Sequence, residues 1–134
     1  MNLFVDTSVW SLALRRDAPP AIAEVGFLEK ALGSDDNVFT TGLILQELLQ
    51  GFRGPKQRRR ILGSFAAFPS ITPSREDHID AAELRNLCRR RGIQVGTIDV
   101  LLAQLCVRHQ LQLLTTDEDF RRIAKVAPLT LVRC

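Results

Sequence analysis

The stretch Met1-Asn2-Leu3-Phe4-Val5-Asp6, followed directly by Thr7-Ser8, decides the fold. Its apolar run is too short for a helix and is typical of a buried β-strand. The strand ends on a carboxylate, and helix-forming sequence follows. Ligands of open α/β sheets bind beyond the carboxyl ends of the strands, so Asp6 is a candidate functional residue. Aspartate is also a preferred helix N-cap, and taken alone Asp6 fits that structural role better.

The composition is that of an ordinary soluble globular protein, with 46% hydrophobic and 25% charged residues. A length of 134 residues predicts a single domain spanning residues 1–134. Uncharged apolar stretches fall well short of the roughly 18 residues that a membrane span needs. We find no basic-then-apolar leader. These features predict a cytoplasmic protein without membrane association.

The net charge and the cysteine spacing give limited information on function. The cysteines are consistent with a reducing compartment. The net charge is +3, and most of the basic residues are arginine, which suits phosphate and gives a weak preference for a nucleic-acid partner. Cys88, Cys106 and Cys134 are odd in number and widely spaced, so they fit neither a disulfide framework nor a zinc site. Cys88 and Cys106 fall at apolar helix positions and are expected to be buried thiols.

Short apolar runs alternate with helical patterns along the whole chain. We predict strands over 3–5, 38–41, 69–73 (at an edge, because prolines flank it), 111–115 and 129–132. We predict helices over 7–14, 21–32, 42–52, from 55 past 65, 74–91, 97–109 and 120–126, with Pro19-Pro20 ending the first. This alternation predicts a three-layer α/β fold, in which helices cover both faces of a central, mostly parallel sheet of four to five strands.

Four acidic residues stand out by position. Asp6 and Asp117 each follow an apolar strand, Asp99 lies in the first turn of an apolar helix, and Glu47 interrupts the helix after the second strand. Each also has a purely structural explanation. Asp99 suits a helix N-terminus, Asp117 suits a helix cap, and Glu47 lies beside two glutamines on a face that solvent would cover.

Together, these positions indicate a site. In a parallel sheet with right-handed crossovers, Asp6, Asp99 and Asp117 should meet at one edge. Carboxylates gathered there repel one another, and a hard divalent cation with oxygen ligands relieves that repulsion. The sequence has no histidine or cysteine cluster that would favour a softer metal.

Four segments carry a family resemblance: Leu3–Ser8, Leu45–Gly51, Gly96–Ala103 and Leu113–Phe120. In order and spacing, the sequence resembles the PIN-domain ribonucleases, and most closely the VapC-type toxins of bacterial toxin–antitoxin pairs. The likeness runs the full length of the chain. One departure is the run after Asp99, which is bulkier than the small residues common there and bears on packing more than on chemistry.

The resemblance implies a metal-dependent endoribonuclease that hydrolyses phosphodiester bonds in a structured RNA, tRNA or rRNA, and so inhibits translation. It implies Mg²⁺ or Mn²⁺ as cofactor, with Asp99 or Asp117 orienting or deprotonating the attacking water. The implied catalytic and metal-binding acids are Asp6, Glu47, Asp99 and Asp117, with Asp119 sharing or taking the role of Asp117, and hydroxyl support from Thr7, Ser8 and Thr116.

Basic residues beyond the acids are candidates for binding the RNA backbone: Arg53, Lys56, Arg58, Arg59 and Arg60. A solvated helix face explains that run equally well.

The resemblance also implies partners. These are a cognate VapB-type antitoxin, whose helix would lie in an apolar groove, a homodimer, and a heterotetramer or larger assembly with the antitoxin. Residues that could line the groove are Trp10, Leu12, Leu14, Phe52 and Phe65, although core packing is favoured for the two phenylalanines.

Two other functions remain open at this stage. One is a non-catalytic PIN-fold regulator that binds RNA or protein, although the presence of all four acids argues against it. The other is an α/β phosphohydrolase or a receiver-type domain. The first strand ends in Asp6-Thr7-Ser8 rather than in the Asp-x-Asp of a haloacid-dehalogenase-like enzyme, and a receiver's second acid and late lysine are missing.

Overall fold

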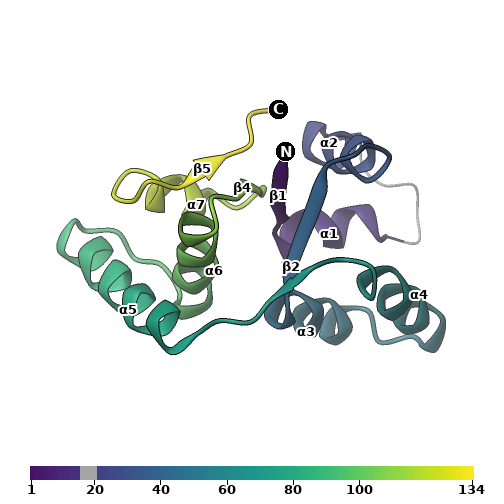
Figure 1. The fold of residues 1–134 in the computed structure, drawn as a ribbon, viewed down its shortest axis with the longest axis horizontal. Coiled ribbons are helices and arrows are strands. Elements are labelled where there is room, and N and C mark those ends of the chain that lie inside the picture. Colours follow the sequence, from purple (N-terminus) through teal and green to yellow (C-terminus); the bar gives the residue numbers. More distant parts are fainter. Residues whose placement is uncertain (16–20) are drawn as a thin grey trace.

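The computed structural model describes residues 1–15 and 21–134 as a five-stranded sheet with helices around it (Figure 1). The strand order is β3-β2-β1-β4-β5, and every adjacent pair is parallel. The strands are β1 (Asn2–Val5), β2 (Asn37–Thr41), β3 (Ser70–Ile71), β4 (Gln112–Leu114) and β5 (Thr130–Leu131). The predicted α/β class and parallel sheet are therefore confirmed, and the segment flanked by prolines forms an edge strand.

Seven helices fill the described segments between the strands. They are α1 (Thr7–Ala13), α2 (Ala23–Leu32), α3 (Gly42–Gly51), α4 (Pro55–Phe65), α5 (Arg75–Arg90), α6 (Thr97–Arg108) and α7 (Glu118–Ile123). The bounds match the predicted ones closely except at α7, which starts and ends earlier because Asp117 caps it. The prediction that Pro19 and Pro20 end the first helix lies outside the described residues.

The order of crossovers places a switch point between β1 and β4. From β1 the chain moves outward through β2 to β3 and then returns past β1 to β4 and β5. In Figure 1, helices α1 to α4 lie on one side of strands β1 and β2, and α5 to α7 lie on the other. Ligand sites of such sheets lie where the strand order reverses, beyond the carboxyl ends of the strands.

The core is centred on β1 and α6. Leu3, Phe4 and Val5 are fully buried, with Phe4 in register with Phe39 of β2 and Leu113 of β4. Helix α6 buries six residues: Val100, Leu101, Leu102, Ala103, Leu105 and Cys106. The bulky run after Asp99 therefore fills the core, as its apolar pattern predicts.

Trp10 of α1 packs in an aromatic cluster with residues from α4 and the segment after it. Its ring centroid lies 4.9 Å from that of Phe65 and 5.5 Å from that of Phe68. Trp10 is 4% exposed, and Leu14 is also buried. The prediction that Trp10 and Leu14 line an apolar groove for an antitoxin helix is therefore wrong, because both belong to the core, as was favoured for Phe65. The buried indole Nε1–H of Trp10 has no hydrogen-bond acceptor among the described residues.

An ion pair between the buried Asp77 and the exposed Arg108 links α5 to the far end of α6. Asp77 is 2% exposed, and its Oδ1 accepts a 2.8 Å hydrogen bond from Nη1 of Arg108, the last residue of α6. Its Oδ2 accepts from the backbone N–H of Ser74, whose hydroxyl in turn caps the backbone N–H of Asp77. Burial raises the pKa of Asp77, but the hydrogen bonds from Ser74 and Arg108 outweigh it and hold the pKa below its ordinary value.

Other predictions hold in the described residues. Cys88 and Cys106 are buried free thiols. None of the described helices combines the length and the apolar character that crossing a bilayer would require.

Candidate active site

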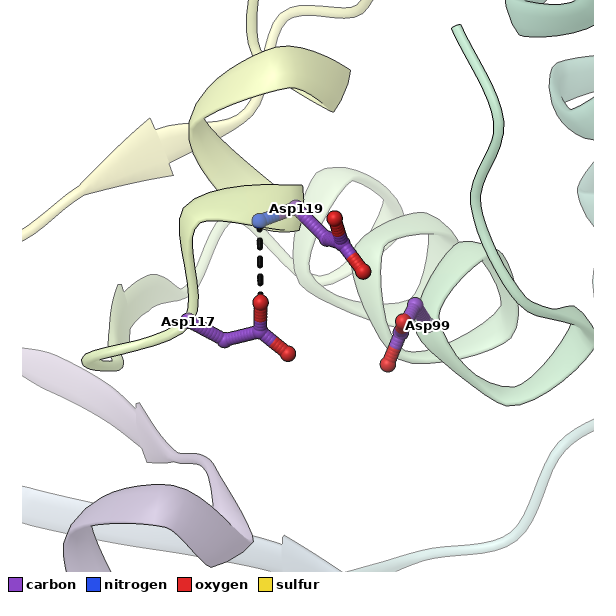
Figure 2. Close-up of side chains that lie close together, drawn as sticks. All are labelled: Asp99, Asp117 and Asp119. Carbon is purple, nitrogen blue, oxygen red and sulfur yellow. Dashed lines mark hydrogen bonds between the residues drawn. The ribbon is translucent and has the colours of Figure 1, made fainter.

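Three carboxylates meet at the carboxyl end of the sheet. Asp99 projects from the first turn of α6, while Asp117 and Asp119 come from the start of α7 (Figure 2). One carboxyl oxygen from each residue lies within 4.8 Å of the other two. Oxygen ligands on one Mg²⁺ are about 3–4 Å apart, given Mg–O distances of about 2.1 Å. Small side-chain movements would thus bring all three onto one ion.

Asp117 caps a helix and also lies in the three-acid group. Its Oδ1 accepts a 2.9 Å hydrogen bond from the backbone N–H of Asp119 and so caps α7. The cap uses one carboxyl oxygen, and the residue still belongs to the three-acid group. Asp119 also contacts Arg122, one turn further along α7, whose Nη2 donates to its Oδ1. Both aspartates therefore belong to the three-acid group.

Asp6 is 7% exposed and lies at the switch point between β1 and β4. Its backbone N–H donates to the carbonyl of Leu114 at 2.9 Å, which continues the β1–β4 ladder. Its Oδ2 accepts hydrogen bonds from the hydroxyls of Ser8 at 2.8 Å and Thr115 at 2.9 Å. Asp6 does occupy the N-cap position of α1, but within the described chain its carboxylate caps no backbone N–H. The hydroxyl pair holds one carboxyl oxygen and leaves the other available.

Thr115, rather than Thr116, supplies a hydroxyl to the site. The Thr115 Oγ1 contacts Asp6 and accepts a 3.0 Å bond from the backbone N–H of Asp117, so it links two of the acids. Thr116 is exposed and contributes its backbone N–H, which donates to the Ser8 hydroxyl at 3.1 Å. The family resemblance implied hydroxyl support from Thr116, whereas the Thr115 hydroxyl is the one that donates to Asp6.

Glu47 of α3 lies near the three-acid group but outside it. Its Oε1 accepts a 2.8 Å hydrogen bond from the hydroxyl of Thr7 in the first turn of α1. The two neighbouring glutamines instead bond to each other on an exposed face, Gln46 Nε2 to Gln50 Oε1 at 2.9 Å. Glu47 is therefore turned away from that solvated face.

The four other acids of the site lie close enough to Asp99 to affect its pKa. Burial, followed by repulsion from Asp117, Asp6, Asp119 and Glu47, raises the pKa of Asp99 to about 6. A cation among these carboxylates would remove the repulsion. The donor set is all oxygen, which suits Mg²⁺ or Mn²⁺.

The predicted RNA-binding cations lie on and just before α4, and all are exposed: Arg53, Lys56, Arg58, Arg59 and Arg60. The structure does not place them in the acidic cluster. The cation that does contact the cluster is Arg122, which sequence reasoning missed. Its spacing of three residues from Asp119 on a helical segment is the signal that would have found it.

The model of the PIN domain family matches residues 3–126. The chain belongs to the PIN domain family. No curated protein matches its sequence.

Solved structures similar to this PIN domain share its fold over nearly the whole chain. A chain of VapBC2 from Rickettsia felis, bound to a DNA fragment from its promoter, aligns with a TM-score of 0.77 at 21% identity, covering 98% of each chain. VapBC-1 from nontypeable Haemophilus influenzae aligns with a TM-score of 0.75 at 17% identity, covering 98% of this chain and 97% of that one.

A third similar structure is a toxin with a named target. VapC20 of Mycobacterium tuberculosis, described as a Sarcin-Ricin loop cleaving toxin, aligns with a TM-score of 0.65 at 18% identity, covering 89% of this PIN domain and 92% of that chain. At these identities, the similarity establishes the fold, which is the one found in VapC-type toxin structures.

Proposed function

We propose that residues 1–134 form a single PIN domain that acts in the cytoplasm as a metal-dependent endoribonuclease, the toxin of a VapBC-type pair. The observation that carries this proposal is the group of Asp99, Asp117 and Asp119, whose carboxyl oxygens lie within 4.8 Å of one another. The substrate would be a structured RNA, tRNA or rRNA, and its cleavage would inhibit translation. The cleaving activity named for VapC20 of M. tuberculosis supports this substrate class.

The contacts of each acid suggest which role it would have in catalysis. Asp99, Asp117 and Asp119 would hold the ion, and Asp6 would add the carboxyl oxygen that its hydroxyl partners leave available. When bound, Mg²⁺ or Mn²⁺ supplies an acidified water and stabilises charge on the phosphate. Asp99 or Asp117 would orient that water or take its proton. Glu47, which accepts a hydrogen bond from Thr7, would be the fifth acid of the site.

The cations of α4 would bind the RNA backbone. Lys56, Arg58, Arg59 and Arg60 lie in the first turns of this helix, where no acidic residue balances them, and the helix dipole disfavours positive charge there. The arginines at the end of α5 (Arg89 and Arg90) lie where the dipole favours them. The helix dipole thus accounts for the α5 arginines but not for the cations of α4.

A VapB-type antitoxin would be the partner, and the toxin would form a homodimer within a heterotetramer or larger complex. Support comes from the similar structures, which are VapBC toxin–antitoxin complexes from R. felis and H. influenzae. The antitoxin surface needs residues other than Trp10 and Leu14, because both are buried.

The test is cleavage of total cellular RNA by purified protein with Mg²⁺ or Mn²⁺, with and without chelator. Discrete products should appear with metal and vanish with chelator or in Asp6→Asn. The matched control is Glu118→Gln, since Glu118 is an exposed acid between Asp117 and Asp119 that pairs with Arg121 instead. Cleavage that persists in chelator and in Asp6→Asn would refute the proposal.

The α4 surface has its own matched pair of variants. Replacing Arg58, Arg59 and Arg60 with alanine should weaken RNA binding and lower the slope of log K against log salt by about two. Replacing Arg89, Arg90 and Arg91 removes the same charge from the end of α5 and should leave RNA binding unchanged. Equal effects of the two triple variants would assign the α4 cations to a general solvated surface.

A further inference from the structure

Two neighbouring arginines on α7 have different surroundings. Arg122 Nη2 donates to Oδ1 of Asp119, a member of the three-acid group, and the two side chains are 51% and 28% exposed. Arg121 pairs with Glu118 at 3.5 Å, where both side chains are about 70% exposed, and it lines a cavity with Thr130 and Val132 on the β5 side of the helix. Both pairs have the same i,i+3 spacing.

Local helix energetics does not distinguish these arginines. Both lie in the last turn of α7, where the dipole favours a cation, and exposed i,i+3 ion pairs contribute little to stability. The two ion pairs differ in their neighbours, because Asp119 belongs to the three-acid group and Glu118 does not. Among the described residues, Arg122 is the one cation that forms an ion pair with any of the five acids at the carboxyl edge of the sheet.

The guanidinium of Arg122 has unused binding capacity. An arginine side chain carries five N–H donors in a planar fork, and one Arg122 nitrogen contacts Asp119. Half of the side chain is open to solvent. A cation held by Asp99, Asp117 and Asp119 would draw the charge of Asp119 to itself, which weakens the pairing of Asp119 with Arg122.

We propose that Arg122 binds a non-bridging oxygen of the RNA phosphate that is cleaved at the acidic site, and that Asp119 holds it in place when no RNA is bound. A phosphodiester has two non-bridging oxygens, so one can face the metal and the other the arginine fork. Donors placed where charge develops on the phosphate accelerate its hydrolysis. This inference rests on the proposed ribonuclease function and names the residue that grips the substrate.

The test compares Arg122→Ala with Arg121→Ala, which removes an equal charge from the adjacent position. Single-turnover cleavage is measured over a range of RNA and salt concentrations, and Mn²⁺ affinity is measured by calorimetry without RNA. Arg122→Ala should lower kcat/KM about 100-fold and reduce its salt slope by about one, while Mn²⁺ affinity stays equal or rises. Arg121→Ala should stay within about twofold of the wild type on every measure, as an exposed pair predicts.

A conservative variant shows whether the charge of Arg122 alone is enough or whether the guanidinium geometry is also needed. Arg122→Lys should recover part of the lost rate, because an ammonium keeps the charge but lacks the fork. If Arg122→Ala cleaves as Arg121→Ala does, Arg122 is a helix ion pair and the inference is wrong. If Arg122→Ala instead weakens Mn²⁺ binding, the residue acts by positioning Asp119 and the inference is also wrong. Failure of the proposed function would look different, because the wild-type protein itself would then not cleave RNA.

Discussion

The pKa values of two aspartates, one at each end of helix α6, are shifted in opposite directions. At its N-terminal end, burial and four neighbouring acids raise the pKa of Asp99 to about 6. At its C-terminal end, Asp77 is even more deeply buried, yet bonds from Ser74 and Arg108 keep its pKa below the ordinary value. Burial raises the pKa of both aspartates, but at Asp99 the neighbouring acids add to that rise, whereas at Asp77 the hydrogen bonds from Ser74 and Arg108 outweigh it. The acids around Asp99 repel one another and would be stabilised by a bound cation. Asp77 already has a cationic partner in Arg108.

The largest effect should come from neutralising the repelling end. Asp99→Asn should lower RNA cleavage about 1000-fold or more and abolish Mn²⁺ binding, because the residue is the centre of the acidic cluster. Single-turnover assays and calorimetry measure both. The control is Glu118→Gln, which changes an exposed acid next to the cluster and should leave both values unchanged. Full activity in Asp99→Asn would remove this end of α6 from the site.

Breaking the paired end should cost stability instead of activity. Asp77→Ala removes the capping interaction with Ser74 and the hydrogen bond from Arg108, whose side chain is 43% exposed, so the free energy of unfolding should fall by about 2 kcal/mol. Urea denaturation checks this. Glu76→Ala, one residue earlier and exposed, should change stability by less than about 0.5 kcal/mol. The folded fraction of Asp77→Ala should still bind Mn²⁺ with wild-type affinity, and a loss of affinity would contradict the separation of the two ends.

The pH dependence of stability should distinguish the two aspartates without metal. Between about pH 4 and pH 6, folded Asp99 keeps a proton that the unfolded chain has released, so its contribution to the unfolding free energy falls as the pH rises. Asp99→Asn should thus stabilise the chelated protein by about 2 kcal/mol at pH 7 and by little at pH 4. Asp77 acts in the opposite sense, since its stabilisation is lost as the pH falls through its lowered pKa.

Urea titrations of the wild type and Asp99→Asn at several pH values, in chelator, measure this difference. A stability gain that is the same at every pH would mean that the substitution acts through packing and not through the charge.

The smallest effect concerns Asp6, whose Oδ2 accepts hydrogen bonds from two hydroxyls. Thr115→Val removes the bond to Oδ2 of Asp6 and the acceptor for the Asp117 N–H, and should weaken Mn²⁺ binding and cleavage about tenfold. Thr116→Val keeps its backbone N–H and should have no effect, because the Thr116 side chain is exposed. If Thr116→Val proved the damaging change, the hydroxyl assignment from the structure would be wrong.

The fold and the closeness of the acids could be predicted because both follow from patterns along the chain. Asp6, Asp99 and Asp117 come after strands or at a helix start, and a parallel sheet brings such positions together. Whether Asp6 is a cap or a site residue could not be decided locally. Its bond to Thr115 joins residues 109 positions apart, so only the assembled β1–β4 pair reveals it.

The misses share a cause of the same kind. Trp10 was expected to line an apolar groove for an antitoxin helix, but α4 and the segment after it cover the indole ring, which no pattern within α1 reveals. Asp77 has the same sequence signature as any acid in a first helical turn, and its partner Arg108 is 31 residues away. The apolar pattern within one helix does not show which residues of another helix it will contact, so such contacts could not be predicted from the sequence.

The aromatic cluster around Trp10 gives the protein an optical property. The chain contains one tryptophan and no tyrosine, so its indole emission reports on a single place, the contact between α1 and α4. Helix α1 begins directly after Asp6, so this signal originates one short helix away from the acidic edge. A partner that parts α1 from α4 would shift the emission to longer wavelength, whereas RNA bound only at the acids would leave it unchanged. The two kinds of binding can therefore be distinguished in solution without attaching a label.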